Sequence, residues 1–297
     1  MTFGAVSTLS NKQNSRLAFQ GVIRFVKFLF RRASTAFAVC AVGVFVVVGL
    51  FAPVIAPFDP LSQNLLRINT TPSYEHWLGT DQFGRDVLSR LIGGTRNSML
   101  FGFLPPLFAA VAGTVIGVTA GYFGGLVDRV LSRIIDTMLS FPELLLAIVI
   151  AAVLGGGFWN VILVITVAFT PAFARVARAS TLSLRNEAYV DAARCLGLSA
   201  PVIIMRHIVP NILAPIVVLM TLWMATSIRL EAALSFLGLG TLPPNPSWGN
   251  IIKDGLNNIF GSPWPVIAAG LFITVVVLSF SLIGDALRDY LDPDLQS

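Results

Sequence analysis

The chain has 297 residues, of which 55% are hydrophobic and only 12% are charged. A soluble domain has about twice that charged fraction, so the composition excludes an ordinary water-soluble protein and predicts an all-α integral membrane protein. The formal net charge is +5. Most of the basic residues flank apolar segments, so this charge indicates membrane orientation and predicts no nucleic-acid partner.

Five uncharged stretches are long enough to cross a lipid bilayer, which takes about 20 apolar residues in a helix. They are residues 33–58, 97–127, 144–174, 208–228 and 255–284. As one helix the third stretch would be about 46 Å long, so we expect it to divide at the glycine run 155–157. The sequence therefore predicts six transmembrane helices, at approximately 33–56, 98–121, 137–155, 158–178, 211–232 and 264–284.

The segment 1–32 before the first span is basic and amphipathic. Its polar residues recur every three or four positions, at Arg16, Gln20, Arg24, Lys27 and Arg31. Two interpretations are open: a helix lying in the headgroup layer, or a flank that obeys the positive-inside rule. Both place the N-terminus in the cytoplasm, and six spans then return the C-terminus there. The chain is thus expected to be a multi-pass protein of the inner (plasma) membrane, with residues 33–297 as its transmembrane domain.

The predicted external loop 57–97 runs into a second helix. Thr80 or Asp81 is positioned to cap it, and an apolar face follows at Val87, Leu88, Leu91 and Ile92. Asp86 and Arg90 are four residues apart on the same segment. This pattern predicts a helix on the outer surface that meets a partner membrane subunit or a docking protein. In the second external loop, 235–262, several prolines stiffen the chain and Trp248 is expected to anchor it at the membrane interface.

Three ionisable residues fall within or at the end of predicted spans. Glu143 lies in the inner half of the third span, and Arg229 and Glu231 lie near the outer end of the fifth. Charges inside a membrane usually face a cavity or a partner. A polar substrate pathway and a structural role are both open for Arg229 and Glu231, whereas for Glu143 the structural role is favoured.

The predicted cytoplasmic loop 179–210 contains a short helix with strong stop and start signals. Asn186 is a suitable N-cap and Glu187 favours the first turn. Gly197 is placed to end the helix in the left-handed conformation. Ser199 and Pro201 then begin a second helix, and the fifth span is expected to begin at Pro210 and Pro215. An ordinary amphipathic connection is the alternative.

This loop resembles a family signature. The pattern Asp191-Ala192-Ala193, three residues, Gly197, twelve residues and Pro210 is similar to the cytoplasmic loop of binding-protein-dependent ABC importer permeases. The chain departs from it with Asp191 for the usual Glu and Val209 for the usual Leu. The resemblance implies that the short helix docks in a groove of an ATPase subunit. The residues expected to couple the chain to the ATPase are Glu187, Ala188, Asp191, Ala192, Ala193, Leu196, Gly197 and Pro210.

Three further segments resemble the second permease subunit of dipeptide, oligopeptide and nickel importers. They are 77–99 (WLGTDQFGRDVLSRLIGGTRNSM), 231–252 (EAALSFLGLGTLPPNPSWGNII) and 284–295 (GDALRDYLDPDL). The resemblance implies a type I ABC importer permease fold. It also implies three kinds of partner: a second, related permease in a heterodimer, two ATPase subunits and an external substrate-binding protein. Peptides are the expected substrates, with nickel, glutathione or opine-like compounds as alternatives.

The chain itself lacks the residues for ATP hydrolysis. A phosphate-binding loop needs Gly-Lys-Ser or Gly-Lys-Thr, and none of the three lysines, at positions 12, 27 and 253, follows a glycine. We therefore expect ATP and Mg²⁺ to be bound by partner subunits, and no cofactor, metal or catalytic residue in this chain. A stand-alone secondary transporter is a weaker alternative, because six spans are few for one and no internal repeat is present.

Overall fold

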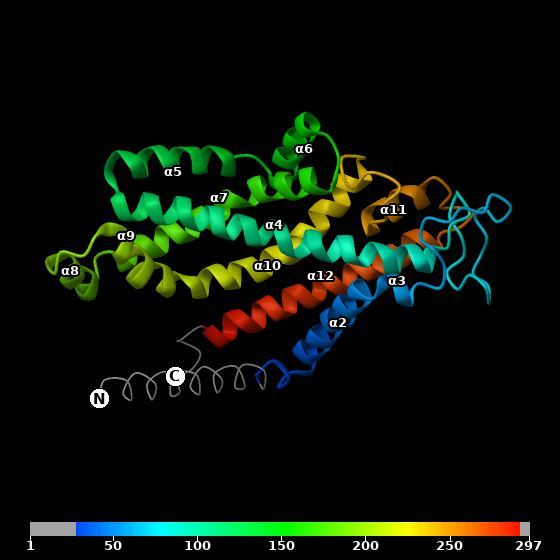
Figure 1. Ribbon diagram of the computed structural model, residues 1–297, viewed down its shortest axis with the longest axis horizontal. Helices are drawn as coiled ribbons and strands as arrows, with labels where there is room; N and C mark the ends of the chain where they lie inside the picture. The colour runs from blue at the N-terminus through cyan, green and yellow to red at the C-terminus, as the bar shows by residue number, and fades with distance from the viewer. Residues whose placement is uncertain (1–27, 292–297) are drawn as a thin grey trace, which may run out of the picture.

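A computed structural model describes residues 28–291 of the chain, and these residues fold almost entirely into helices (Figure 1). The all-α prediction is therefore confirmed. The first 27 residues of the predicted segment 1–32 and the end 292–297 lie outside the described residues. The helices are α2 (Ala33–Leu50), α3 (Ala52–Ile55), α4 (Val87–Phe123), α5 (Gly125–Leu139), α6 (Glu143–Leu154), α7 (Phe158–Leu184), α8 (Ala188–Cys195), α9 (Ala200–Ile203), the π-helical turn η1 (Ile204–Ile208), α10 (Val209–Phe236), α11 (Trp248–Leu256) and α12 (Trp264–Leu291).

Five of these segments are long and apolar enough to cross a membrane. They are α2, α4, α7, the continuous stretch Ala200–Phe236 and α12. The pair α5 and α6 makes a sixth crossing if its two bent halves are taken together. If α5 and α6 together count as one span, the number of spans is six, as the sequence predicts.

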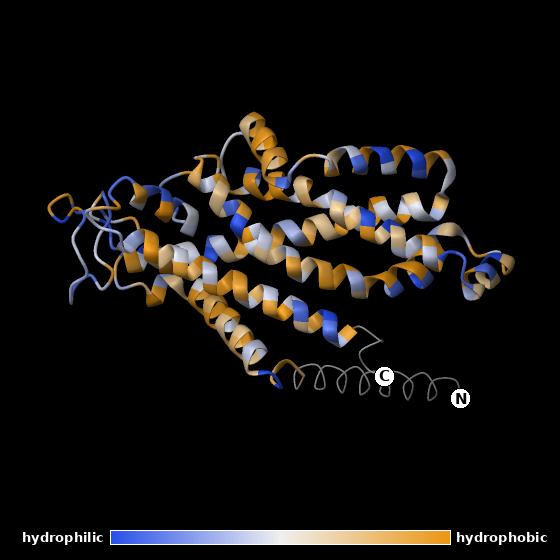
Figure 2. Cartoon of the chain, turned by 180° about the vertical axis from the view of Figure 1, so that it is seen from behind, coloured by the Kyte–Doolittle hydropathy of each residue, from blue (hydrophilic) through white to orange (hydrophobic). Residues whose placement is uncertain are grey.

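The third span differs from its prediction. A continuous helix over 137–155 is wrong, because the chain bends by 95° between α5 and α6. Pro142 precedes α6 with an extended ψ of 133°, and a proline also disfavours helical geometry in the residue before it. The helix α5 before the bend is amphipathic, and Figure 2 shows hydrophilic and hydrophobic residues alternating along it. Glu143 is the first residue of α6 and is exposed.

Most predicted span boundaries move outward in the structure, including the end of α12, which lies at Leu291 and not at 284. The helix α4 begins at Val87 and not near residue 98, because Asp86 caps it by accepting a hydrogen bond from the Ser89 N–H at 2.8 Å. The helix α7 continues to Leu184, past the predicted end at 178. The fifth span begins at Ala200 and not at 211, because α9, η1 and α10 follow one another without a break. The loop predicted over 179–210 is thus shortened to residues 185–199.

Contacts between segment ends define two opposite ends of the molecule. At one end the Arg185 guanidinium donates to the Gly121 carbonyl at 2.9 Å, which joins the C-terminal ends of α7 and α4. At the other end the Gly157 N–H donates to the Gly240 carbonyl at 3.0 Å, so the loop before α7 meets the loop after α10. Figure 1 shows α8 at the first end, and α11 and the loop before α4 at the second.

The helices α4 and α7 form the closest packed pair. Gly113, Gly117 and Gly121 are spaced four residues apart on α4 and face α7. A Cβ atom at Gly113 would lie 2.7 Å from the Thr170 carbonyl oxygen, and one at Gly121 would lie 3.0 Å from that of Arg178. Small residues at this spacing let two membrane helices approach closely. The stripe was not identified from the sequence.

Trp248 corrects another prediction. It does not anchor a loop at the membrane surface, because its side chain is fully buried. The indole N–H donates to the Leu91 carbonyl at 3.3 Å. The ring packs edge-to-face against Phe45 and Phe272, with ring centroids 5.5 and 5.9 Å away. A buried indole that satisfies its N–H in this way is a core residue, here at the junction of α2, α4, α11 and α12.

Candidate functional site

The short helix α8 lies between two long apolar helices at one end of the molecule (Figure 1). Its N-cap is Glu187, with φ −73° and ψ 143°, so the prediction of Asn186 was wrong by one residue. The Glu187 carbonyl accepts the Val190 N–H at 2.9 Å, and no side chain caps the first turn. Asp191 stands in that first turn, where a negative charge is favourable to the helix dipole.

The C-terminal end of α8 is a Schellman motif, in which two crossed backbone hydrogen bonds close the helix. The Leu198 N–H donates to the Ala193 carbonyl at 3.2 Å, and the Gly197 N–H donates to that of Arg194 at 2.9 Å. Gly197 has φ +77°, so the prediction of a left-handed glycine at this position is confirmed. A Cβ atom there would meet nothing within 4 Å. Backbone conformation, rather than space, is therefore what selects glycine.

The two sides of α8 differ in exposure. The predicted docking residues Ala188, Asp191, Ala192 and Leu196 are exposed. Ala193 is buried and belongs to the chain's own hydrophobic core together with Val190. The prediction that placed Ala193 on the docking face is therefore wrong, and the exposed face is available to another protein. Glu187 is exposed beside it.

Side chains attach α8 to the helices around it. The Arg194 guanidinium forms an ion pair with Asp191 at 2.8 Å and lies 5.5 Å from the Tyr122 ring centroid at the end of α4. The rings of Tyr189 and His207 lie 6.3 Å apart, which connects α8 to η1. These contacts connect α8 to the end of α4 and, through η1, to the start of α10.

The chain leaves α8 through a short turn and enters one long helical element. Ser199 is the N-cap of α9 and Pro201 stands in its first turn, as predicted. Pro210 lies in the first turn of α10. The span does not begin there, because the helical stretch Ala200–Phe236 already runs through this position. At 1.5 Å per residue the 37 residues of Ala200–Phe236 extend about 55 Å. This exceeds the bilayer core of about 30 Å, so the element projects beyond the membrane.

The three ionisable residues proposed for a substrate pathway do not form one site. Arg229 is exposed, and its guanidinium donates to the Thr226 hydroxyl at 3.0 Å. Glu231 is 1% exposed and accepts a hydrogen bond from the Ser235 hydroxyl at 2.6 Å. Within residues 28–291 no ion pair or hydrogen bond joins Glu143, Arg229 and Glu231 to one another. The burial of Glu231 favours the structural interpretation.

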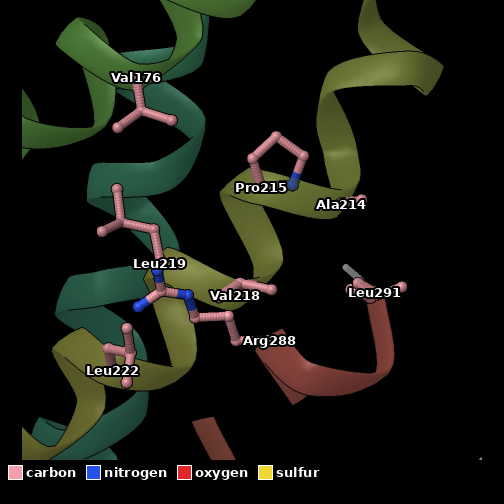
Figure 3. A pocket seen from close by; sticks show the side chains of 8 residues that line it. All are labelled: Val176, Ala214, Pro215, Val218, Leu219, Leu222, Arg288 and Leu291. Atoms are coloured by element: carbon pink, nitrogen blue, oxygen red, sulfur yellow. The ribbon is translucent and has the colours of Figure 1, made fainter. Parts of the chain in front are cut away.

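A pocket of about 380 Å³ opens between α10 and α12 at a different position. Figure 3 shows the Arg288 side chain of α12 reaching toward α10, with its guanidinium between Leu219 and Leu222. The remaining wall is mostly apolar and includes Pro215. None of the three predicted pathway residues lines this pocket.

A buried charge network at the other end of the molecule was missed. Arg85 donates to Asp81 at 2.7 Å and to Asp254 at 3.0 Å, and Arg90 donates to Asp254 at 3.2 Å. Burial raises the pKa of the Asp254 carboxyl, and the nearby Arg85 only partly offsets this. Asp86 caps α4 and contacts His76 at 2.9 Å. In the sequence, the i, i+4 spacing of Asp81 and Arg85 was the pattern from which this ion pair could have been predicted.

This network overturns the predicted surface helix in segment 77–99. Val87, Leu91 and Ile92 are buried at the start of α4, and Asp86 and Arg90 are buried with them. Asp81 and Thr80 do not cap α4. The Asp81 carboxylate instead accepts the backbone N–H groups of Phe83 and Arg85. The segment is an interior junction between the loop before α4 and α11.

The comparisons with known proteins agree with this architecture. The family "Binding-protein-dependent transport system inner membrane component" matches residues 113–297. The dipeptide transport system permease protein DppC of Alkalihalophilus pseudofirmus is 43% identical over 253 residues, covering 85% of this chain and 83% of that protein. The glutathione transport system permease protein GsiD of Escherichia coli is 41% identical over 271 residues, covering 90% and 89%.

Among solved structures, the methionine ABC transporter MetNI in an inward-facing conformation contains a chain with the same fold. Its TM-score is 0.54 at 18% sequence identity, covering 68% of this chain and 96% of that chain. This likeness shows the fold alone, which is that of a type I ABC importer permease. With the family match and the relatives above 40% identity, the chain belongs to the binding-protein-dependent ABC importer permeases of the inner membrane.

Proposed function

We propose that the chain is one permease subunit of an ATP-driven importer of short peptides. An external substrate-binding protein would deliver the peptide, and two ATPase subunits would supply the energy. The observation that carries this proposal is the exposed face of α8, which is joined by a Schellman turn to a helical element of 37 residues. Because α8 also contacts α4 through Arg194 and Tyr122, a push on this face displaces two spans.

The ATPase partners follow from the same helix. The chain has a single exposed helix of this kind among its described residues, and it engages a single ATPase. ATPases of this family resemble one another in working as pairs, so at least two permease subunits are needed. The likeness to the second permease of peptide importers supports a related but different chain as the other subunit. ATP and Mg²⁺ are assigned to the ATPase pair.

The substrate assignment rests on the relatives. One is a dipeptide permease and others are glutathione permeases, and both substrates are short peptides with free carboxylate and amino groups. Nickel and opine-like compounds remain the alternatives. The orientation proposed from the basic residues places α8 and both termini in the cytoplasm. The Arg32–Asp289 ion pair at 2.9 Å holds the start of α2 beside the end of α12, which agrees with termini on one side.

The test is reconstitution of the complete complex in liposomes. We expect uptake of a labelled dipeptide that requires ATP and the external binding protein. The matched control is the same complex with a hydrolysis-deficient ATPase pair. Uptake by this chain alone, driven by a proton or sodium gradient, would assign it to the secondary transporters instead.

A further inference from the structure

The hydrophilic residues of α5, visible in Figure 2, share one side of the helix. At 3.6 residues per turn its four charged side chains fall within about 140° of one another around the helix axis. Together with one serine they form the polar face of α5, which consists of Asp128, Arg129, Ser132, Arg133 and Asp136. A pocket of about 850 Å³ lies over this face and reaches Arg178 of α7.

The polar face lies at a depth where the neighbouring helix α4 is apolar. The Arg175 guanidinium of α7 donates to the Asp136 carboxylate at 3.0 Å, so these two residues are level. Arg175 is about 15 Å along α7 from Arg185 at the α8 end. Between residues 97 and 123 α4 has no charged side chain. Within this stretch, Gly117 packs against the turn of α7 that contains Arg175. The charges of α5 therefore lie beside an apolar part of a membrane span.

Lipid does not suit this face. Charged side chains in a membrane span almost always face the protein interior or a water-filled cavity. Long arginine side chains can reach the headgroup layer, but Asp136 has a short side chain that is 61% exposed. Its carboxylate and that of Asp128 would also repel anionic headgroups. Arg129 and Arg133 are exposed and form no ion pair within residues 28–291. An exposed face with charges of both signs requires water.

We propose that the polar face of α5 is one wall of a water-filled passage through which the solute reaches the cytoplasm. The passage would lie between this chain and the second permease. Ion pairs of Asp128 with Arg178 and of Asp136 with Arg175 attach the polar face to α7. The helix α7 leads directly into α8, so the wall is connected to the helix proposed to face the ATPase. This inference rests on the proposed function and deepens it, because it assigns the passage to one face of one helix.

The test measures the access of water to this face with single cysteines. Cys40 and Cys195 are both exposed and are first replaced by serine; uptake by this background complex is the reference. Arg129→Cys and Arg133→Cys are then treated separately, in inside-out membrane vesicles, with a charged thiol reagent that does not cross membranes. The matched control is Val115→Cys on α4, because Val115 is 62% exposed within the same apolar stretch. Since the reactive thiolate forms in water and not in lipid, both arginine positions should react about tenfold faster than the control.

Nucleotide distinguishes a passage from an ordinary solvated surface. With ATP and a hydrolysis-deficient ATPase pair, alternating access should close the passage to the cytoplasm and slow the labelling of Arg133→Cys by about tenfold. The labelled complex is then purified and reconstituted in liposomes. We expect the adduct at Arg133→Cys to abolish ATP-dependent uptake of a labelled dipeptide. The Val115→Cys complex, treated in the same way, should import at the reference rate.

Three results would overturn the inference: equal labelling of Arg133→Cys and Val115→Cys, labelling that ATP does not change, or full uptake by the labelled Arg133→Cys complex. The first is expected if lipid or a partner subunit covers the face, and the other two if it is ordinary cytoplasmic surface. A background complex that imports dipeptide with ATP but gives any of these results has the proposed function without this passage. A complex that shows the labelling pattern and its response to ATP, but whose background does not import, retains the water-accessible face and refutes the proposed function.

Discussion

The Nη2 atom of Arg85 lies 3.0 Å from the Oδ2 atom of Asp254, although the two residues are 169 positions apart in the chain. Arg90 reaches the same carboxylate oxygen at 3.2 Å. A single carboxylate thus holds the loop before α4 against α11. Two of the segments that resemble the peptide importers, 77–99 and 231–252, meet beside this contact. This end of the chain is therefore one packed body rather than two independent loops.

Replacing Asp254 should loosen that body. Asp254→Asn removes one of the two carboxylates that Arg85 and Arg90 share, the other being that of Asp81, and the two arginine side chains are only 6% and 4% exposed. Removal of one partner from a buried ion pair is strongly destabilising, and because Asp254 is 28% exposed we expect a loss of about 2 kcal/mol. Thermal unfolding of the purified complex in detergent measures this change.

The control is Asp136→Asn, which removes an ion pair with Arg175 whose side chains are 61% and 60% exposed. It should change stability by less than about 0.5 kcal/mol. Equal effects of the two substitutions would show that the buried network does not stabilise the chain.

The glycine stripe of α4 gives a second prediction. Gly117→Ala places a Cβ atom 2.8 Å from the Arg178 nitrogen and 2.7 Å from the Ala177 Cβ, so α4 and α7 must separate. We expect a loss of about 1–3 kcal/mol. Gly270→Ala on α12 is the matched control, because nothing lies within 4 Å of its Cβ position. That substitution should be neutral or slightly stabilising, since alanine favours helix.

The local features of the chain were predictable from the sequence. Hydropathy identified the spans because a segment inside the bilayer must be apolar. It must also satisfy its backbone hydrogen bonds internally, as a long helix does. Gly197, Ser199 and Pro201 act within a few residues of their own positions, so the turn after α8 was predicted correctly. The errors at the helix ends came from taking the end of an apolar run as the end of a helix. Asp86 caps α4, which begins at Val87, eleven residues before the expected start at 98.

The long-range features were not predictable from local pattern. Trp248 finds its hydrogen-bond partner Leu91 157 positions away. The pairing of Arg85 with Asp254, the burial of Ala193 and the burial of Glu231 all depend on which helices become neighbours. A charged residue near the end of a span has the same sequence signature whether it faces a pathway or its own core. Only the packing distinguishes these cases.

Glu231 provides a test of that distinction. Its side chain is 1% exposed and hydrogen-bonded to Ser235, so we expect Glu231→Gln to retain most of the transport rate. Glu231→Ala removes the acceptor for the Ser235 hydroxyl and leaves a cavity, and should cost about 2 kcal/mol of stability. Uptake assays in liposomes and thermal unfolding separate the two effects. A large loss of transport in a stable Glu231→Gln complex would restore Glu231 to the substrate pathway.

The orientation of the chain can be measured with fused reporters. A reporter after Ser297 should be active in the cytoplasm, and one inserted at the exposed Ser62 should be active outside. This follows from the excess of basic residues on the side of the N-terminus. A C-terminal reporter found outside would reverse α8 and remove it from reach of the ATPases.

The last prediction concerns Gly197, where conformation can be separated from bulk. Gly197 has φ +77° and open space around it, so a larger side chain costs only what the left-handed backbone costs. That cost is about 1–2 kcal/mol for a branched residue, whereas asparagine adopts this conformation more readily. Gly197→Val should open the Schellman turn and rotate α8, while the spans insert normally through their own packing. We expect normal abundance in the membrane, loss of transport, and poor recovery of the ATPases in purification.

Gly197→Asn should keep transport and ATPase binding close to those of the unmodified chain. The two variants differ in backbone preference at a site with room for both side chains. If Gly197→Val transports normally with its ATPases bound, α8 does not couple the ATPases to the spans.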